Sequence, residues 1–152
     1  MYQRILVPVD GSSTSQQGLA EAIALAKLTG GCIHLLHVMR EPFEAIGIDG
    51  AMCSGVDIHQ LLREGGQLVL AKATETVQKS GIAVESELLE SFAERVCDVI
   101  VRVAQTWPAD LIVIGTHGRR GVGRMLLGSD AEQVLRYAPV PVLLVRGTAT
   151  GN

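Results

Sequence analysis

A glycine-rich segment brings together residue types that bind phosphate groups. It begins at Gly115, directly after the apolar run Leu111–Ile114. Gly115 and Gly118 have no Cβ, so their backbone N–H groups can lie directly against a ligand. Arg119 and Arg124 follow, and guanidinium groups form charge-assisted hydrogen bonds with phosphate oxygens. This pattern predicts a phosphate-binding loop between a strand and a helix.

The helix that follows is expected to contribute to the same site. It begins at Gly128-Ser129, and the free N–H groups at a helix N-terminus attract anions. His117 lies inside the glycine-rich segment, where it can donate to a phosphate or serve as a turn residue. Phosphoryl transfer needs a positioned base and usually a pair of metal-holding carboxylates. The only candidates, Asp10, Asp130 and His117, have no obvious partner, so we predict no catalytic residue.

Strand-like and helix-like segments alternate along the chain. Three capping-box sequences predict helix starts: Ser13-x-x-Gln16, Ser91-x-x-Glu94 and Ser129-x-x-Glu132. A further helix is expected between residues 58 and 77, where the pair Gly65-Gly66 interrupts the helical pattern. The expected strands are Ile5–Val9, Ile33–Val38, Val84–Leu89, Leu111–Ile114 and Val140–Val145. The alternation predicts an α/β fold, a doubly wound parallel sheet with helices on both faces.

The strand patterns also predict the order of the sheet. The first and fourth strands are continuous apolar runs, as in strands buried on both faces. The third strand alternates, and the fifth carries Pro141, so both are expected at edges. The order 3-2-1-4-5 satisfies these conditions. It puts the topological switch point between strands one and four, where Asp10 and Gly115 follow, and ligands bind at such a point.

The glycines and the two terminal strands together resemble the universal stress protein family. The spacing G-x2-G-x9-G-S from Gly115 to Ser129 is similar to the nucleotide-binding signature of its ATP-binding branch. Ile5–Ser12 and Pro139–Val145 resemble the family's first and last strands. The resemblance implies a cytoplasmic protein that binds ATP or another adenine nucleotide, with Mg²⁺ accompanying the nucleotide. Such a protein would act as a stress-response regulator rather than a catalyst.

The resemblance also implies roles for residues at the ends of the first two strands. Asp10 would lie beside the ribose and adenine region, Pro8 and Val9 would line the adenine side, and Val38 would offer backbone groups to the base. Asp10 also begins the sequence Asp-Gly-Ser-Ser, which often forms an Asx turn, and both roles are compatible. Val38 is otherwise a core residue.

Asp130 departs from the family pattern, which often has a small or β-branched residue after the Gly-Ser pair. A carboxylate in the first turn of a helix interacts favourably with the helix dipole. It also repels a phosphate that approaches the same N–H groups, or it helps to hold Mg²⁺ beside the phosphates. We favour repulsion, because the acid already uses part of the positive potential of the helix.

Composition excludes several classes of protein. Of the 152 residues, 47% are apolar and 19% charged, as in a globular domain, expected here over residues 1–147 with a short tail at 148–152. The net charge of −3 argues against a nucleic-acid partner. No apolar stretch is long enough to span a membrane, and no targeting segment is visible. Three cysteines without metal-like spacing fit a reducing cytoplasm.

No metal site is predicted from the histidines and cysteines. His34 and His37 lie on an apolar strand, where hydrogen-bonded interior histidines are expected. Cys53, Asp57 and His59 are close in sequence, but no second cluster completes four ligands, so we interpret them as part of a loop. Cys32 and Cys97 are expected to be small buried residues.

The fifth strand predicts a homodimer. Its residues Val142–Val145 are apolar on both faces although the strand is expected at an edge, and an exposed apolar edge must be covered or paired. A two-fold axis would set Val140–Val145 antiparallel to its copy, as the resemblance also implies. The alternative functions are a dimeric interaction module that has lost effective nucleotide binding, and a weak ATPase.

Overall fold

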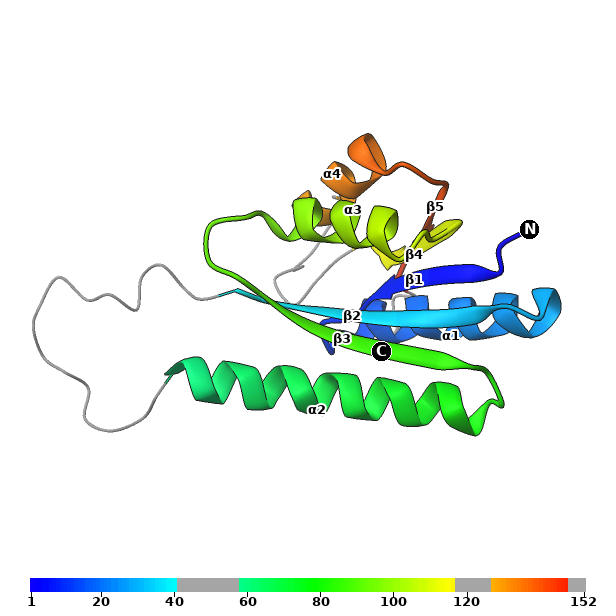
Figure 1. The fold of residues 1–152 in the computed structure, drawn as a ribbon, viewed down its shortest axis with the longest axis horizontal. Helices are drawn as coiled ribbons and strands as arrows, with labels where there is room; N and C mark the ends of the chain where they lie inside the picture. The colour runs from blue at the N-terminus through cyan, green and yellow to red at the C-terminus, as the bar shows by residue number, and fades with distance from the viewer. Residues whose placement is uncertain (41–57, 117–126, 148–152) are drawn as a thin grey trace, which may run out of the picture.

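A five-stranded parallel sheet forms the centre of the protein (Figure 1). The computed structural model describes residues 1–40, 58–116 and 127–147. The strands are β1 (Arg4–Pro8), β2 (Cys32–Arg40), β3 (Val84–Ser91), β4 (Leu111–Gly115) and β5 (Val142–Val145). Their order, β3-β2-β1-β4-β5, confirms the predicted order and the predicted edges.

Two helices cover each face of the sheet (Figure 1). Helices α1 (Ser13–Thr29) and α2 (Ile58–Lys79) cover one face, and α3 (Val96–Thr106) and α4 (Ser129–Tyr137) cover the other. None of the helices in the described ranges is long and apolar enough to cross a membrane.

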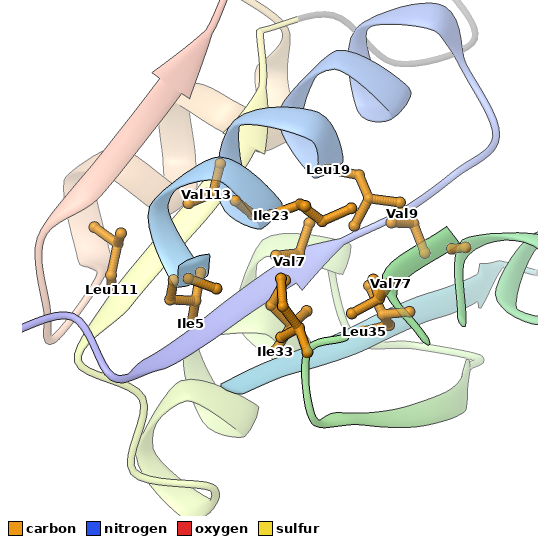
Figure 2. Packing of buried hydrophobic residues seen from close by; sticks show 14 of the residues in the cluster. Ile5, Val7, Val9, Leu19, Ile23, Ile33, Leu35, Val77, Leu111 and Val113 are labelled. Atoms are coloured by element: carbon orange, nitrogen blue, oxygen red, sulfur yellow. The ribbon is translucent and has the colours of Figure 1, made fainter. Parts of the chain in front are cut away.

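Alternate residues of the central strands supply the two cores. Ile5, Val7 and Val9 point toward α1, with Leu19 and Ile23 of the helix packed against them (Figure 2). Leu6, between them in sequence, belongs to the core under α3 and α4. Because successive side chains of a strand point to opposite faces, a continuous apolar run fills both cores.

The helix ends differ from the capping predictions. The hydroxyl of Ser12, one residue earlier than expected, caps α1. Ser91 ends β3 and its hydroxyl donates to the carbonyl of Glu94, while α3 begins only at Val96. Gly128, not Ser129, is the N-cap of α4. The capping-box pattern is local, and pairing of β3 with β2 as far as Ser91 overrides it.

The bounds of several strands also differ from the prediction, those of β2 and β5 among them. β2 extends two residues beyond Val38 because it pairs with β3 as far as Arg40. β5 begins at Val142, since Pro141 accepts a hydrogen bond from Ile112 through its carbonyl but has no N–H to donate. His59, expected in a loop, lies in the first turn of α2. Cys53 and Asp57 lie outside the described residues.

Candidate functional site

The sheet opens at its predicted switch point. β1 pairs with β2 along its whole length, from Arg4 to Pro8, and β4 pairs with β5 as far as Gly115. Between β1 and β4, however, the paired positions are only Ile5 with Leu111 and Leu6 with Ile112. Pairing between the two central strands thus stops before their carboxyl ends, at the kind of switch point where open α/β sheets bind ligands.

The turn after β1 is held by its own side chains. The N–H of Ser12 donates to Oδ1 of Asp10 at 2.9 Å, which is the expected Asx turn. The N–H of Asp10 donates to the hydroxyl of Ser15, and the N–H of Ser15 donates to that of Ser12, both at 3.2 Å. Gly11 at the bend has φ +81°, in the left-handed region. Asp10 itself is half-buried.

The turn before α4 is built differently. Among the described residues, no side chain caps the helix, whose N-cap is Gly128. The N–H of Gly128 donates to the carbonyl of Thr116 at 2.6 Å, and the N–H of Thr116 donates to the carbonyl of Val145. The backbone thus fixes the start of α4 beside the ends of β4 and β5. The N–H groups of its first turn have no acceptor within the helix, and they suit an anion.

Gly115 has a packing role that the sequence did not reveal. A Cβ at Gly115 would lie 2.8 Å from the carbonyl carbon and oxygen of Thr14. Gly18 of α1 packs against the same glycine, since its own Cβ would lie 3.4 Å from the Gly115 nitrogen. Thr14 is buried at this junction, and Gly147 packs on its methyl group. The absence of a side chain at Gly115 therefore lets α1 approach the end of β4.

Asp130 lies in the first turn of α4, half-buried. Burial raises the pKa of the Cys97 thiol on α3, and the negative charges of Asp98 and Asp130 raise it further. The negative charge of Asp130 therefore acts on the Cys97 thiol of α3 as well as on the N-terminus of its own helix. In this position its carboxylate lowers the positive potential of the α4 N-terminus.

The remaining predicted site residues divide into two groups. Pro8 and Val9 lie at the end of β1, and Val38 is half-buried in β2, where it packs on the core under α3 and α4. The other four predicted residues lie outside the described part of the chain: His117, Gly118, Arg119 and Arg124.

The two histidines of β2 have different surroundings. His37, as expected, is buried and hydrogen-bonded, with Nδ1 2.8 Å from the carbonyl oxygen of Val9. His34 is buried too, but neither ring nitrogen forms a hydrogen bond. Nδ1 lies 3.5 Å from Oε2 of Glu85, and Nε2 lies 3.4 Å from Oε2 of Glu87. The expectation of a hydrogen-bonded side chain is therefore wrong for His34. Within the described ranges, no three His, Cys, Asp or Glu side chains gather in a way that could hold a metal ion.

Comparison with known proteins places this fold in a family. The model of the universal stress protein family matches residues 1–146. The universal stress protein MJ0531 of Methanocaldococcus jannaschii is 36% identical over 147 residues, which cover 96% of this chain and 83% of that protein.

Solved structures agree with this match. The structure of MJ0577, from the same archaeon, superposes with a TM-score of 0.81 at 26% identity and covers 99% of both chains. The universal stress protein from Archaeoglobus fulgidus in complex with dAMP superposes with a TM-score of 0.69 at 25% identity, over 95% of this chain and 98% of that one. From the family match and these relatives, we conclude that the chain belongs to the universal stress protein family.

Proposed function

We propose that this protein binds an adenine nucleotide, with ATP as the expected ligand, at the carboxyl ends of β1 and β4. The observation that carries the proposal is the start of α4. Its N-cap is a glycine that presents no capping side chain within the described residues, at the point where the sheet opens. The Archaeoglobus fulgidus relative in complex with dAMP supports an adenine nucleotide as the ligand.

In this proposal the phosphates lie at Gly128 and Ser129, near Gly115 at the end of β4. His117, Gly118, Arg119 and Arg124, the other predicted phosphate-binding residues, are assigned to the same site from the sequence motif alone. The base and ribose lie toward Pro8, Val9, Asp10 and Val38. Mg²⁺ typically binds through one or two carboxylates together with substrate phosphates. Asp130, the acid nearest to the α4 N-terminus in sequence, is the residue that fits this role if the metal accompanies the nucleotide.

We propose a regulatory role in the cytoplasm rather than catalysis. The Asp10 carboxylate accepts from the backbone of Ser12, which gives it a structural task in the turn after β1, whereas phosphoryl transfer needs a positioned base. Asp130 lies in the first turn of α4, where its charge interacts with the helix dipole. A nucleotide that is bound but not consumed can report its own concentration by stabilising the bound form of the protein.

Calorimetric titration of the purified protein with ATP, in Mg²⁺ and in chelator, tests the proposal. Binding with one site per chain is expected. A substitution of Gly128 by Val, which places a branched side chain where the phosphate approaches, should abolish the heat of binding while the midpoint of thermal unfolding stays near that of the wild type. No binding at millimolar ATP would instead favour the interaction module without a nucleotide.

We further propose a homodimer formed through β5. The strand lies at the edge of the sheet, Leu143 is 39% exposed, and its neighbours Val142, Leu144 and Val145 are half-buried. An edge of this length and apolarity is stabilised by pairing with a second copy. Leu143→Lys should convert the dimer to a monomer in light scattering, whereas Leu68→Lys, which changes a more exposed apolar residue on α2, should not. A monomeric wild-type protein at micromolar concentration would contradict this proposal.

A further inference from the structure

His37 links the end of β1 to helix α2. Val9 is the first residue after β1, and both of its backbone polar groups contact β2. Its N–H donates to the carbonyl of Leu36 at 2.8 Å, and its carbonyl oxygen lies 2.8 Å from Nδ1 of His37. His37 is 8% exposed, so water does not compete freely for this hydrogen bond. The backbone position of Val9 is therefore set by a side chain as well as by the sheet.

The chemistry of the hydrogen bond fixes the tautomer of His37. A carbonyl oxygen can only accept, so the proton must lie on Nδ1 of the imidazole. Nε2 then points toward the middle of α2, close to Gly66. The imidazole of His37 therefore donates to Val9 on one side and packs against Gly66 on the other, which fixes the orientation of the ring.

Gly66 makes the space for the His37 ring. A Cβ at this position would lie 2.7 Å from Cδ2 and 3.0 Å from Nε2 of His37, and 2.9 Å from Cδ1 of Leu88, a flexible side chain on β3. Glycine in a helix interior is unfavourable relative to alanine, so the packing of the ring explains this exception. Gly65, its neighbour on the same helix, offers a matched control, because a Cβ placed there would meet no atom within 4 Å.

We propose that His37 is a positioning residue of the nucleotide site, with Gly66 as its supporting contact. His37 acts through Val9, whose fixed carbonyl sets the direction in which Asp10 leaves the sheet and enters its turn with Ser12. Val9 and Asp10 are the residues that we place beside the base and ribose. This inference rests on the proposed function, and a ligand-free measurement below separates the two.

Four variants test the role in binding, with the Kd for ATP and Mg²⁺ measured by calorimetry. His37→Leu removes the donor at similar volume and should weaken binding at least fivefold. His37→Asn keeps a donor at nearly the same place and should restore the Kd to within about twofold of the wild type. Gly66→Ala displaces the ring and should weaken binding about as much as His37→Leu, whereas Gly65→Ala should leave the Kd unchanged.

A purely structural role predicts a different pattern. Val77→Ala truncates a fully buried residue of α2 in the same core, and it should lower the unfolding temperature without changing the Kd. If Val77→Ala weakens ATP binding as much as His37→Leu, or if His37→Asn fails to restore it, the positioning role is wrong.

Nuclear magnetic resonance of the ligand-free protein tests the same contact without nucleotide. The nitrogen signals of His37 should show the Nδ1–H tautomer, and amide hydrogen exchange at Asp10, Gly11 and Ser12 should accelerate in His37→Leu and Gly66→Ala but not in Gly65→Ala. An Nε2–H tautomer, or unchanged exchange in both variants, would overturn the inference even if ATP binds. If ATP does not bind but the exchange pattern holds, the proposed function fails while the positioning of Asp10 by His37 stands.

Discussion

Helices α1 and α4 both begin at the carboxyl edge of the sheet, but their first turns are satisfied in different ways. At α1, the hydroxyl of Ser12 accepts from Ser15 and the carboxylate of Asp10 accepts from Ser12. At α4, the N-cap is Gly128, and acids at Asp130 and Glu132 follow inside the helix. Where a side chain caps a helix, fewer N–H groups of the first turn are available to bind an anion. Where the N-cap is glycine, no N-cap side chain competes with the ligand for those N–H groups.

The end of β4 joins these two helix starts. Gly115 packs against the backbone of Thr14 in α1, and the next residue, Thr116, accepts the N–H of Gly128 before α4. The two glycines of the predicted motif that the structure describes therefore have separate roles. Gly115 is required for packing, while Gly128 leaves a helix end without a side chain.

A charged side-chain cap on α4, which has none among the described residues, should produce the largest effect. Gly128→Asp places a carboxylate at the N-cap, where it accepts the helix N–H groups and repels phosphate. We expect ATP affinity to fall roughly 100-fold, or about 2.7 kcal/mol. Because aspartate is at least as good an N-cap as glycine, the unfolding temperature should not fall. Titration calorimetry and thermal unfolding measure the two quantities.

A neutral cap distinguishes competition from charge. Gly128→Ser offers one hydroxyl acceptor without a negative charge, so its loss of affinity should be much smaller than that of Gly128→Asp. Unchanged affinity in Gly128→Asp would mean that phosphate does not use the start of α4.

Gly115→Ala should have the next largest effect, which is a lower free energy of unfolding. The new Cβ would lie 2.8 Å from backbone atoms of Thr14, which cannot rotate away as a side chain would. Overpacking of this kind typically costs about 1–3 kcal/mol. Urea unfolding should show this loss, and Gly65→Ala, at an open helix position, should show none. Equal stability of Gly115→Ala and the wild type would contradict the packing role.

Removal of the α1 cap should have a moderate effect on stability alone. Ser12→Ala removes the hydroxyl that accepts from Ser15, and loss of such a cap costs about 1 kcal/mol. Because α1 is not the helix that we expect to hold phosphate, the ATP affinity should stay within about twofold of the wild type. A large loss of affinity with little loss of stability would shift the phosphate site from α4 to α1.

The sequence predicted the sheet better than it predicted the helix ends. Strand order followed from long apolar runs, which reflect burial on both faces of the sheet, and from Pro141, which has no N–H to donate to a further strand. The capping boxes missed the N-caps of α1 and α4 by one residue each. At Ser91 the miss was larger, because a short polar pattern does not reveal how far a strand continues. Cap position depends on where tertiary pairing ends, as the ladder of β3 shows.

The switch point of the sheet and the turn after β1 were predictable from the sequence, but the contacts that support this turn were not. The switch point between β1 and β4 followed from topology, and Asp10 formed its Asx turn as expected. The contact between His37 and Val9 joins residues 28 positions apart, and the pair Gly65-Gly66 indicated only a weak point in a helix. A glycine that disturbs a strong helical pattern was the available signal that another group packs there.

The smallest predicted effect concerns Asp130, where the start of α4 differs most from an ideal anion site. If its carboxylate repels phosphate, Asp130→Asn should tighten ATP binding by about two- to fivefold, since a charge near a helix end is typically worth about 0.3–1 kcal/mol. The gain should appear in both Mg²⁺ and chelator, and Glu132→Gln, which neutralises a second acid in the same turn, should give less. A role in holding Mg²⁺ makes the opposite prediction, because Asp130→Asn would then weaken binding only when Mg²⁺ is present. Unchanged affinity in both conditions would show that the acid serves the helix dipole and not the ligand.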